Sequence, residues 1–409
     1  MTDPVTARLF AALEAAGGKG CVLFVGGCVR DALMGREADR PDIDLAVALT
    51  PDRVQQAVEA AGLCVHPTGL AHGVVTVTHG ARVFEVASLR RDVATDGRRA
   101  VVAYSQDWRE DAARRDFRLN ALYANLTGEI FDPTGAGVAD AQAGRIVFVG
   151  DPTTRIREDY LRSLRFFRFF AWYGRGDPDP VALAAIANAT QGLQALSVER
   201  VAKEMLKLFA APDPRAAVHA ARETGVLAKL APEFQAFARF DRLVARDREI
   251  LGIVDPLIRL TALLPSDPAA VKAMAQRLRL STAERDRMAA SAARALVLSS
   301  ATPQADLRRA IWRHGAQAVK DGLRLALADA QAPIDAVAWQ EAFAYADRWT
   351  PPPFPISGDD ILAAGARPGP EVGAVRRAVE AWWLAQDFPS DQAAAIRVAR
   401  TAISHLQGD

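Results

Sequence analysis

The sequence has little of several features that mark particular classes of protein. Only three of its 409 residues are cysteines, in no C-x-x-C pair, and an odd number argues against a disulfide framework. No apolar run approaches the roughly 20 residues that a membrane-spanning helix requires. The N-terminal residues are too polar and acidic for a secretory signal. We therefore expect a cytoplasmic protein with no membrane partner.

The chain also has almost no net charge, because its basic and acidic residues are nearly equal in number. Lys and Arg together number 50 against 49 Asp and Glu, which leaves a formal charge of +1. A protein of this composition that binds nucleic acid must concentrate its arginines on one surface, because the chain as a whole supplies no attractive field. The length predicts two or three domains.

The periodicity of the sequence changes at about residue 150. Before that point the pattern is mixed, with strands expected at 21–25 and 43–49, a helix at 51–61, and a hairpin formed by 74–78 and 82–88. After it, apolar residues recur at spacings of three and four, which predicts helices. The expected fold class is α+β: a small mixed β-sheet head followed by an all-helical arm.

The first segment that carries chemistry is FVGGCVRD, residues 24–31. A strand runs into Gly26 and Gly27 and then into a helix. Glycines allow backbone N–H groups to approach a polyphosphate, and Arg30, one turn later, can neutralise a phosphate. A plain strand–helix turn with no ligand explains the segment about equally well, and it lacks the GxGxxG spacing of a dinucleotide fold.

The second is DIDLAV, residues 42–47, which places Asp42 and Asp44 at the start of the expected strand 43–49. Residues two apart in a strand face the same way, so both carboxylates can bridge metal ions. Glu85, an acid centred in the apolar strand 82–88, is the best candidate for a third carboxylate. The alternative for all three is a solvated acid on an exposed strand.

The third is DAARRDFRLNAL, residues 111–122, which includes the RRD segment at 114–116. Arg114 and Arg115 are suited to phosphate because each planar guanidinium donates two bonds at once. Asp116 beside them is an acid that can orient one guanidinium, and Asn120 follows a helical turn later. An amphipathic helix with a solvated charged face is the plainer interpretation.

The fourth is EDYLRSLRFFR, residues 158–168. We expect one helix through this segment, with Asp159, Arg162 and Arg165 on an arc away from its buried stripe and Arg168 further round. An Asp–Arg pair one turn apart can accept the base edges that C and A share and reject U and G. A surface i,i+3 salt bridge is the alternative. The buried stripe is expected to comprise Ile156, Tyr160, Leu164 and Phe167.

Together and in this order, these four motifs resemble those of class II tRNA nucleotidyltransferases and bacterial poly(A) polymerases, in the DNA polymerase β-like superfamily. The segments 131–140 and 197–204 resemble the hinge and a later helical motif of that family, and 356–361 and 367–370 resemble its tail. The resemblance implies a nucleotidyltransferase head at 1–148, a neck for base recognition at 149–212, a body at 213–350 and a tRNA-binding tail at 351–409.

The resemblance also implies roles for the residues. Asp42 and Asp44 would bind Mg²⁺ and catalyse the reaction. The nucleotide would be held by the glycine turn, the RRD segment and the neck. The implied activity is template-independent addition of CCA to the 3′ end of tRNA from CTP and ATP, with release of pyrophosphate. The implied nucleotide-binding residues are Gly26, Gly27, Arg30, Arg114, Arg115, Asp116, Asn120, Asp159, Arg162, Arg165 and Arg168.

Three other functions are open at this point. A poly(A) polymerase or an enzyme that adds only CC or A shares the motifs, although residues 89–108 resemble the complete flexible loop of full CCA-adding enzymes. A glycosyltransferase uses a DxD pair to hold the metal of a nucleotide sugar, but has no need of RRD or EDxxRxxR. A catalytically dead RNA-binding relative is disfavoured by the intact Asp42 and Asp44. No HD-type phosphohydrolase activity is expected, since none of the three histidines beyond residue 80 precedes an Asp.

Overall fold

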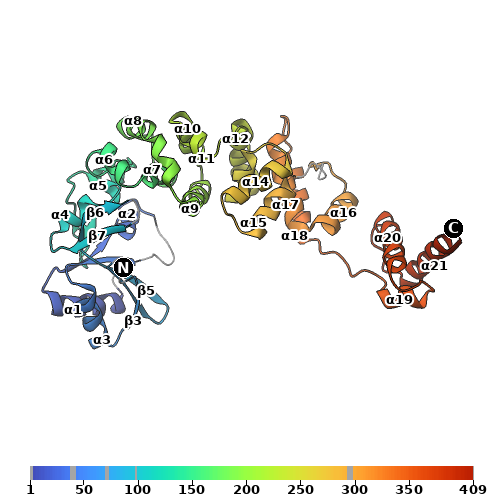
Figure 1. The fold of residues 1–409 in the computed structure, drawn as a ribbon, viewed down its shortest axis with the longest axis horizontal. Helices are drawn as coiled ribbons and strands as arrows, with labels where there is room; N and C mark the ends of the chain where they lie inside the picture. The colour runs from blue at the N-terminus through green and yellow to red at the C-terminus, as the bar shows by residue number, and fades with distance from the viewer. Residues whose placement is uncertain (1–2, 37–42, 70–72, 97–98, 293–297, 409) are drawn as a thin grey trace. The chain divides into compact units, whose positions relative to one another are not determined.

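The chain divides into two compact units, Met1–Phe234 and Gln235–Asp409. The computed structural model (Figure 1) describes residues 3–36, 43–69, 73–96, 99–292 and 298–408. Within these residues no helix has the length and apolar character needed to cross a bilayer. The four-part division predicted from the sequence is finer than these two units and stays a prediction.

The first unit is built on a seven-stranded sheet in the order β3-β4-β5-β2-β1-β8-β9. Strands β2 and β5 pair in parallel and the other neighbours are antiparallel, so the mixed sheet predicted for the head is confirmed. The expected hairpin is present as β4 and β5. The strands are β1 Val22–Val25, β2 Ile43–Val47, β3 Cys64–Gly69, β4 Val74–His79, β5 Arg82–Ser88, β8 Tyr123–Ala124 and β9 Ile130–Phe131.

The two faces of this sheet have different neighbours. Phe24 lies opposite Leu45 in the β1–β2 pair, and its ring lies 4.9 Å from that of Phe10 on α1, Pro4–Gly17. Helix α1 therefore covers the face that carries Leu45, and α3, Pro51–Ala60, packs beside α1. Because side chains alternate along a strand, Asp44 and Ala46 point to the opposite face, where Ala46 packs against α4, Trp108–Ala113. The candidate site lies on this second face.

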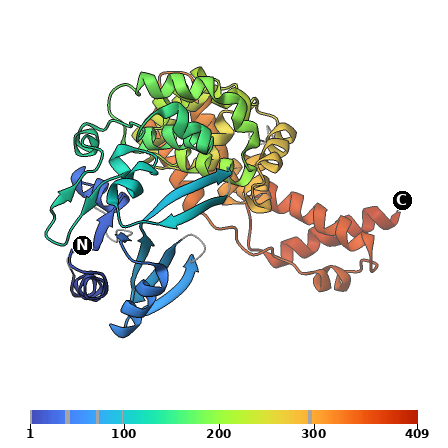
Figure 2. The same cartoon turned by 60° about the vertical axis from the view of Figure 1, so that its left-hand side comes forward.

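Strands β6, Arg90–Asp96, and β7, Arg99–Tyr104, form a separate two-stranded antiparallel sheet. Figure 2 shows the pair as a ribbon beside the larger sheet. The sequence resemblance described this segment as a flexible loop; its described residues form a hairpin.

The helix expected through the EDYLRSLR segment is interrupted. Helix α6 spans Pro152–Glu158 and α7 spans Leu161–Tyr173. Between them Asp159 is extended (φ −154°, ψ 105°), and its carboxylate accepts the N–H of Leu161 at 3.1 Å. This bond replaces a helical one. The interruption moves Leu161 (6% exposed) into the core, and Tyr160, predicted to be buried, is only partly so.

Aromatic side chains pack α7 against the segment that follows the RRD motif. The ring of Phe117 lies 4.9 Å from that of Phe148 and 5.1 Å from that of Phe169 on α7. Phe117 is fully buried, and such aromatic contacts stabilise beyond simple area burial. The pairing places the RRD segment directly against α7. The remaining helices of this unit are α2 Gly27–Leu33, η2 Arg118–Asn120, α5 Gly137–Ala143, α8 Pro180–Asn188, η3 Thr190–Ala195, α9 Val198–Phe209, α10 Arg215–Glu223 and α11 Val226–Leu230.

The regular elements described in the second unit are all helices, as the sequence predicts. One core lies among α16, α17 and α18 and includes Leu323, and another lies among α19, α20 and α21 and includes Val375. Its helices are α12 Phe237–Arg246, η4 Asp247–Leu251, α13 Pro256–Ala262, α14 Pro268–Arg277, α15 Thr282–Ser291, α16 Gln304–His314, α17 Ala316–Asp329, α18 Ala336–Arg348, α19 Gly358–Ala363, α20 Pro370–Ala385 and α21 Gln392–Gly408.

Candidate functional site

A pocket of about 440 Å³ in the first unit brings most of the predicted site residues together. It draws on the β1–α2 turn, β2, the RRD segment, the α6–α7 junction and α9. Of the residues predicted from the sequence, Glu85 and Arg168 do not line it, and Asp42 lies outside the described residues. The lining residues are Gly26, Gly27, Arg30, Asp44, Arg114, Arg115, Asp116, Asn120, Asp159, Leu161, Arg162, Arg165, Phe169 and Arg200.

The glycine turn requires its first glycine. Gly26 has φ +71° and ψ −118°, a backbone conformation that costs side-chain-bearing residues free energy. A Cβ there would also lie 3.5 Å from Nη1 of Arg115. The backbone conformation is therefore what requires glycine, and it places the turn beside Arg115.

Arg30 is held from three sides and forms part of the pocket wall. It is 6% exposed and donates to Oδ1 of Asn120 at 2.6 Å, to the hydroxyl of Tyr173 at 2.7 Å and to Oδ1 of Asp31 at 2.9 Å. Its guanidinium also lies 3.8 Å from the centre of the Tyr173 ring. Most of its donors are thus already used, and its predicted contact with phosphate stays a prediction.

The structure places Asp44 and Glu85 next to each other. They are direct partners in the parallel β2–β5 pair, so they share a face of the sheet with backbones about 4.8 Å apart. Asp44 lines the pocket, whereas Glu85 is exposed beside it. Carboxylate oxygens are the ligands that Mg²⁺ prefers. Over the described part of the chain, no three acidic, histidine or cysteine side chains gather as a metal site; Asp42 is outside that part, and Asp44 fits a metal-binding role.

The acid that orients both RRD arginines is Asp111. Its carboxylate accepts Nε of Arg114 at 2.9 Å, Nε of Arg115 at 3.0 Å and the hydroxyl of Tyr123 at 2.7 Å. Burial alone would raise the pKa of Asp111, but the two guanidiniums outweigh it and hold that pKa below its ordinary value. The sequence-based assignment of this role to Asp116 was wrong, because nothing in the local pattern distinguishes the two acids.

Asp116 instead connects the head to α7. It accepts Nε of Arg165 at 2.9 Å and Nδ2 of Asn120 at 3.1 Å. Burial would raise its pKa, but the charge of Arg165 and these hydrogen bonds keep the pKa lowered. Asp116 is therefore ionised in the fold and fixes Arg165 at the pocket.

Asp159 and Arg162 both line the pocket but do not pair with each other through their side chains. Asp159 accepts Nη2 of Arg200 on α9 at 2.7 Å. Arg162 donates to the carboxylate of Glu158 and, at 2.8 Å, to the carbonyl of Arg155. The expected i,i+3 pair is absent here because the chain leaves the helix at Asp159 and turns that carboxylate toward α9.

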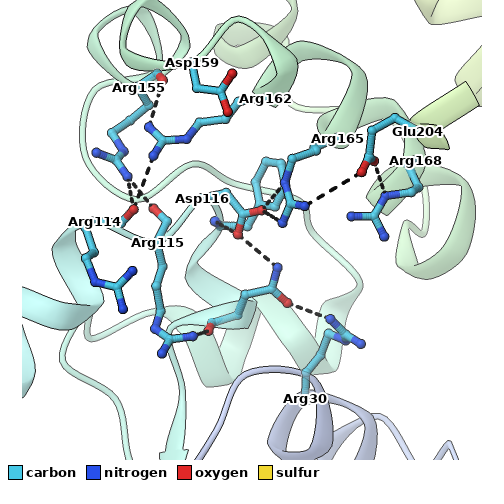
Figure 3. Close-up of polar contacts among 12 residues, drawn as sticks. Arg30, Arg114, Arg115, Asp116, Arg155, Asp159, Arg162, Arg165, Arg168 and Glu204 are labelled. Atoms are coloured by element: carbon cyan, nitrogen blue, oxygen red, sulfur yellow. Dashed lines mark hydrogen bonds and ion pairs between the residues drawn. The ribbon is translucent and has the colours of Figure 1, made fainter. Parts of the chain in front are cut away.

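Arg168 lies behind the pocket wall. Its Nε donates to Glu204 of α9 at 2.6 Å, and its guanidinium lies 4.4 Å from the centre of the Phe169 ring. Arg165 lies between Asp116 and the same Glu204, 4.0 Å from the latter. Figure 3 shows this row of charges along α7. Arg168 therefore supports the wall formed by Phe169 and Arg165.

The pocket is strongly basic although the chain is nearly neutral. Six arginines and three aspartates line it, against a formal charge of +1 for 409 residues. Sequence analysis missed Arg200, Leu161 and Phe169 at this pocket; the segment 197–204 was noted as a family motif but not resolved to residues. This concentration of guanidiniums suits a polyphosphate.

Comparisons with known proteins identify the family of this chain. Residues 22–147 match the family described as "Poly A polymerase head domain", and residues 177–237 match "Probable RNA and SrmB- binding site of polymerase A". Mitochondrial CCA tRNA nucleotidyltransferase 1 of Mus musculus is 31% identical over 375 residues, 88% of this chain and 82% of the mouse protein. The CCA-adding enzyme of Lacticaseibacillus paracasei is 30% identical over 93% of this chain and 91% of its own length.

The fold is also that of a solved relative. The crystal structure of the Bacillus stearothermophilus CCA-adding enzyme in complex with CTP superimposes with a TM-score of 0.78 at 23% identity, and the match covers 100% of both chains. The sequence relatives span most of their own lengths as well as this one. This chain belongs to the family of CCA-adding tRNA nucleotidyltransferases.

Proposed function

We propose that this chain adds CCA to the 3′ end of tRNA from CTP and ATP, without a template and with release of pyrophosphate. The observation that carries the proposal is the single pocket that joins Asp44, six arginines and the Asp159–Arg162 segment. Its volume of about 440 Å³ lies in the range of small-molecule sites, and its charge suits a triphosphate. The reaction is in-line attack of the RNA 3′-hydroxyl oxygen on the α-phosphorus, which forms the new P–O bond as the bond to pyrophosphate breaks.

Asp42 and Asp44 would hold Mg²⁺, with Glu85 as a third carboxylate. When bound, the ion lowers the pKa of the attacking hydroxyl and neutralises charge that develops at the α-phosphate. The register of Asp44 with Glu85 supports this assignment. A second carboxylate two residues from Asp44 would suit the bridging of two ions.

The arginines would hold and orient the triphosphate. Arg114 and Arg115 are fixed by Asp111, so little side-chain entropy is lost when they bind phosphate. The backbone of Gly26 and Gly27 lies beside Arg115. Arg30, Asn120 and Asp116 keep this wall in place through their mutual bonds. The arrangement favours positioning of the nucleotide before chemistry.

Asp159 and Arg162 would read the base. Carboxylate and guanidinium present acceptors and donors, and C and A share a pattern that complements them whereas U and G do not. Arg165 would support the pair from α7. The contacts of Asp159 with Arg200 and of Arg162 with Glu158 hold both side chains at the pocket edge.

The test uses purified protein, Mg²⁺, CTP and ATP with a tRNA transcript that ends before CCA, resolved at single-nucleotide length. Growth by three nucleotides followed by arrest is expected. A long A ladder would instead identify a poly(A) polymerase, and growth by two nucleotides would identify a CC-adding enzyme. In a parallel reaction supplied with a nucleotide sugar, turnover of that sugar would identify a glycosyltransferase.

We also propose the cytoplasm as the compartment, since Cys21, Cys28 and Cys64 are free thiols. Fractionation of cells that produce the tagged chain tests this proposal.

A further inference from the structure

Arg155 is a buried arginine that the proposed mechanism does not use. It lies on α6, is 7% exposed, and is not among the residues that line the pocket. Placing a guanidinium in a buried position costs free energy unless its donors are used. Arg155 makes two sets of contacts, one with the RRD segment and one with Glu158 and Arg162.

Toward the head, Arg155 binds the main chain of the RRD segment. Its Nη2 donates to the carbonyl of Arg115 at 2.8 Å and also to the carbonyl of Arg114. These two residues are the ones proposed to hold the triphosphate. One guanidinium nitrogen thus fixes two successive peptide units directly behind the phosphate-binding side chains.

Toward the neck, Arg155 binds the base-reading segment. Its Nη1 donates to Glu158, and its own carbonyl accepts Nη1 of Arg162 at 2.8 Å. Arg162 closes the ring, because its Nη1 donates to the same Glu158 and its Nη2 donates to the carbonyl of Arg114 at 3.3 Å. Figure 3 shows both guanidiniums converging on the main chain at Arg114 and Arg115.

The buried position of Arg155 has two costs. Burial, followed by the neighbouring charge of Arg162, lowers the pKa of Arg155. Within the described residues its Nε is buried without a hydrogen-bond partner. An apolar side chain of similar length would avoid both costs, but it would leave the two carbonyls and Glu158 without this donor.

We propose that Arg155 is a positioning residue that fixes the distance between the base-reading pair and the triphosphate-holding arginines. This inference rests on the proposed function. A base that satisfies Asp159 and Arg162 then places its α-phosphate correctly for attack, whereas a base that displaces Arg162 also shifts the carbonyl of Arg114 and the phosphates with it. Base recognition is thereby expressed in the chemical step as well as in binding.

The experiment compares CTP with UTP in single-turnover addition to a tRNA transcript that ends before CCA, for wild type, R155A and R155K. We expect R155A to reduce the maximal rate with CTP by about 100-fold, the scale of a misplacement of about 1 Å, and to reduce the C-over-U ratio of kcat/KM by at least about 10-fold. R155K replaces the planar guanidinium, which donates from several nitrogens, with a single ammonium group. We therefore expect its C-over-U ratio of kcat/KM to lie between those of wild type and R155A.

R53A is the matched control. Arg53 on α3 also donates to a main-chain carbonyl of the head, that of Ala16, and does not line the pocket; its C-over-U ratio should equal that of wild type. A purely structural role for Arg155 would lower CTP and UTP incorporation by the same factor. R155K retains the positive charge and serves as the test variant if R155A does not fold. A C-over-U ratio of kcat/KM in R155K equal to that of wild type would overturn the proposal. Failure of wild type to extend the tRNA would overturn the proposed function instead.

Discussion

Each unit contains a network of arginines and aspartates, and the two networks differ in what surrounds them. In the first unit, Arg162, Arg165 and Arg200 have side chains that are 13%, 32% and 39% exposed, and they face a pocket. In the second, Arg324 and Asp247 are 2% and 0% exposed. The same pairing chemistry is therefore open to a ligand in one place and closed in the other.

The buried Arg324–Asp247 pair is the centre of this closed network, a chain of shared carboxylates whose outer members Arg287 and Asp255 are 25% and 19% exposed. Arg324 donates Nε to Asp247 at 3.0 Å and lies 3.6 Å from Asp255. Arg287 donates to Asp255 and, at 2.7 Å, to Asp321. These groups join η4, the N-cap of α13, α15 and α17, so the network connects helices that are far apart in the sequence.

The comparison teaches that an ion-pair network indicates a site through the pocket that it faces, and not through its composition. The sequence offered no way to tell EDYLRSLR from the acidic and basic residues of the second unit, other than resemblance. The pocket arginines face a space of about 440 Å³, whereas Arg324 in the second unit is paired with the buried carboxylate of Asp247. Substitutions in the network of the first unit should reduce nucleotide addition. Substitutions in the network of the second unit should reduce the free energy of unfolding.

The largest expected effect is from Asp44→Ala. Loss of a proposed Mg²⁺ ligand at the reacting phosphate should reduce nucleotide addition by about 10³-fold or more, which corresponds to about 4 kcal/mol of transition-state stabilisation. Single-turnover extension measures it, with tRNA binding as the control that should be nearly unchanged. Retention of nucleotide incorporation by Asp44→Ala would contradict the assignment of Asp44 as a metal ligand.

Glu85→Gln in the same assay tests whether the neighbouring carboxylate takes part in metal binding. If it does, the rate of nucleotide addition should fall by at least about 10-fold.

The second effect concerns the closed network. Asp247→Ala leaves Arg324 buried without its main partner, which should cost about 3–5 kcal/mol of unfolding free energy. Urea unfolding of the full chain measures it, while the extension rate per folded molecule should stay at the wild-type value. Asp247→Leu combined with Arg324→Met should recover much of the loss, because it removes both charges. A double variant as unstable as the single one would contradict this account.

The third effect distinguishes two arginines of α7. Arg162→Ala should reduce discrimination of C over U by about 10–100-fold, since one polar base contact provides about 1–3 kcal/mol of discrimination. Arg168→Ala, which removes a side chain that binds Glu204 behind the wall, should change the ratio less. Competition between labelled CTP and UTP measures both. Equal slowing of all four nucleotides by Arg162→Ala would show that Arg162 does not read the base.

The smallest effect is on pH dependence. The pKa values of Asp111 and Asp116 are lowered from 3.8 in the fold, burial being outweighed by the arginines. A carboxyl with a lowered folded pKa contributes stability that is complete above its unfolded value and is lost as the pH falls through the folded value. The contribution of these two carboxyls to the free energy of unfolding should thus be constant from pH 8 to about 5 and should decline below about pH 4. Asp116→Asn should weaken that decline in urea midpoints measured across the range; an unchanged decline would contradict it.

The sequence predicts the elements whose causes are local. The strand expected at 21–25 is present as β1, Val22–Val25, and the expected hairpin is present as β4 and β5. The helix expected after the two glycines is present as α2. The convergence of Arg115, Asp116 and Arg162 on one pocket followed from resemblance. It could not be worked out from spacing, because it depends on how α7 packs against Phe117.

The rest depends on partners that are distant in the chain. Arg200 reaches Asp159 across 41 residues, and Arg155 reaches the carbonyl of Arg115 across 40. Whether Asp159 continues a helix or interrupts it is decided by such contacts, since helical propensity differs little between the two outcomes. The choice of Asp111 as orienting acid likewise needs Tyr123, whose hydroxyl reaches it from β8.

The spread of the pocket along the chain has a consequence for its assembly during synthesis. The lining residues begin at Gly26 and end at Arg200, and Arg30 bonds to Tyr173 across 143 residues. A ribosome adds about 5–20 residues per second, so about 10–40 s pass before the last wall of the pocket has been made. Until then the nascent chain presents the arginines of residues 30–165 without Arg200, and the lining of the pocket is complete only once α9 has joined the fold.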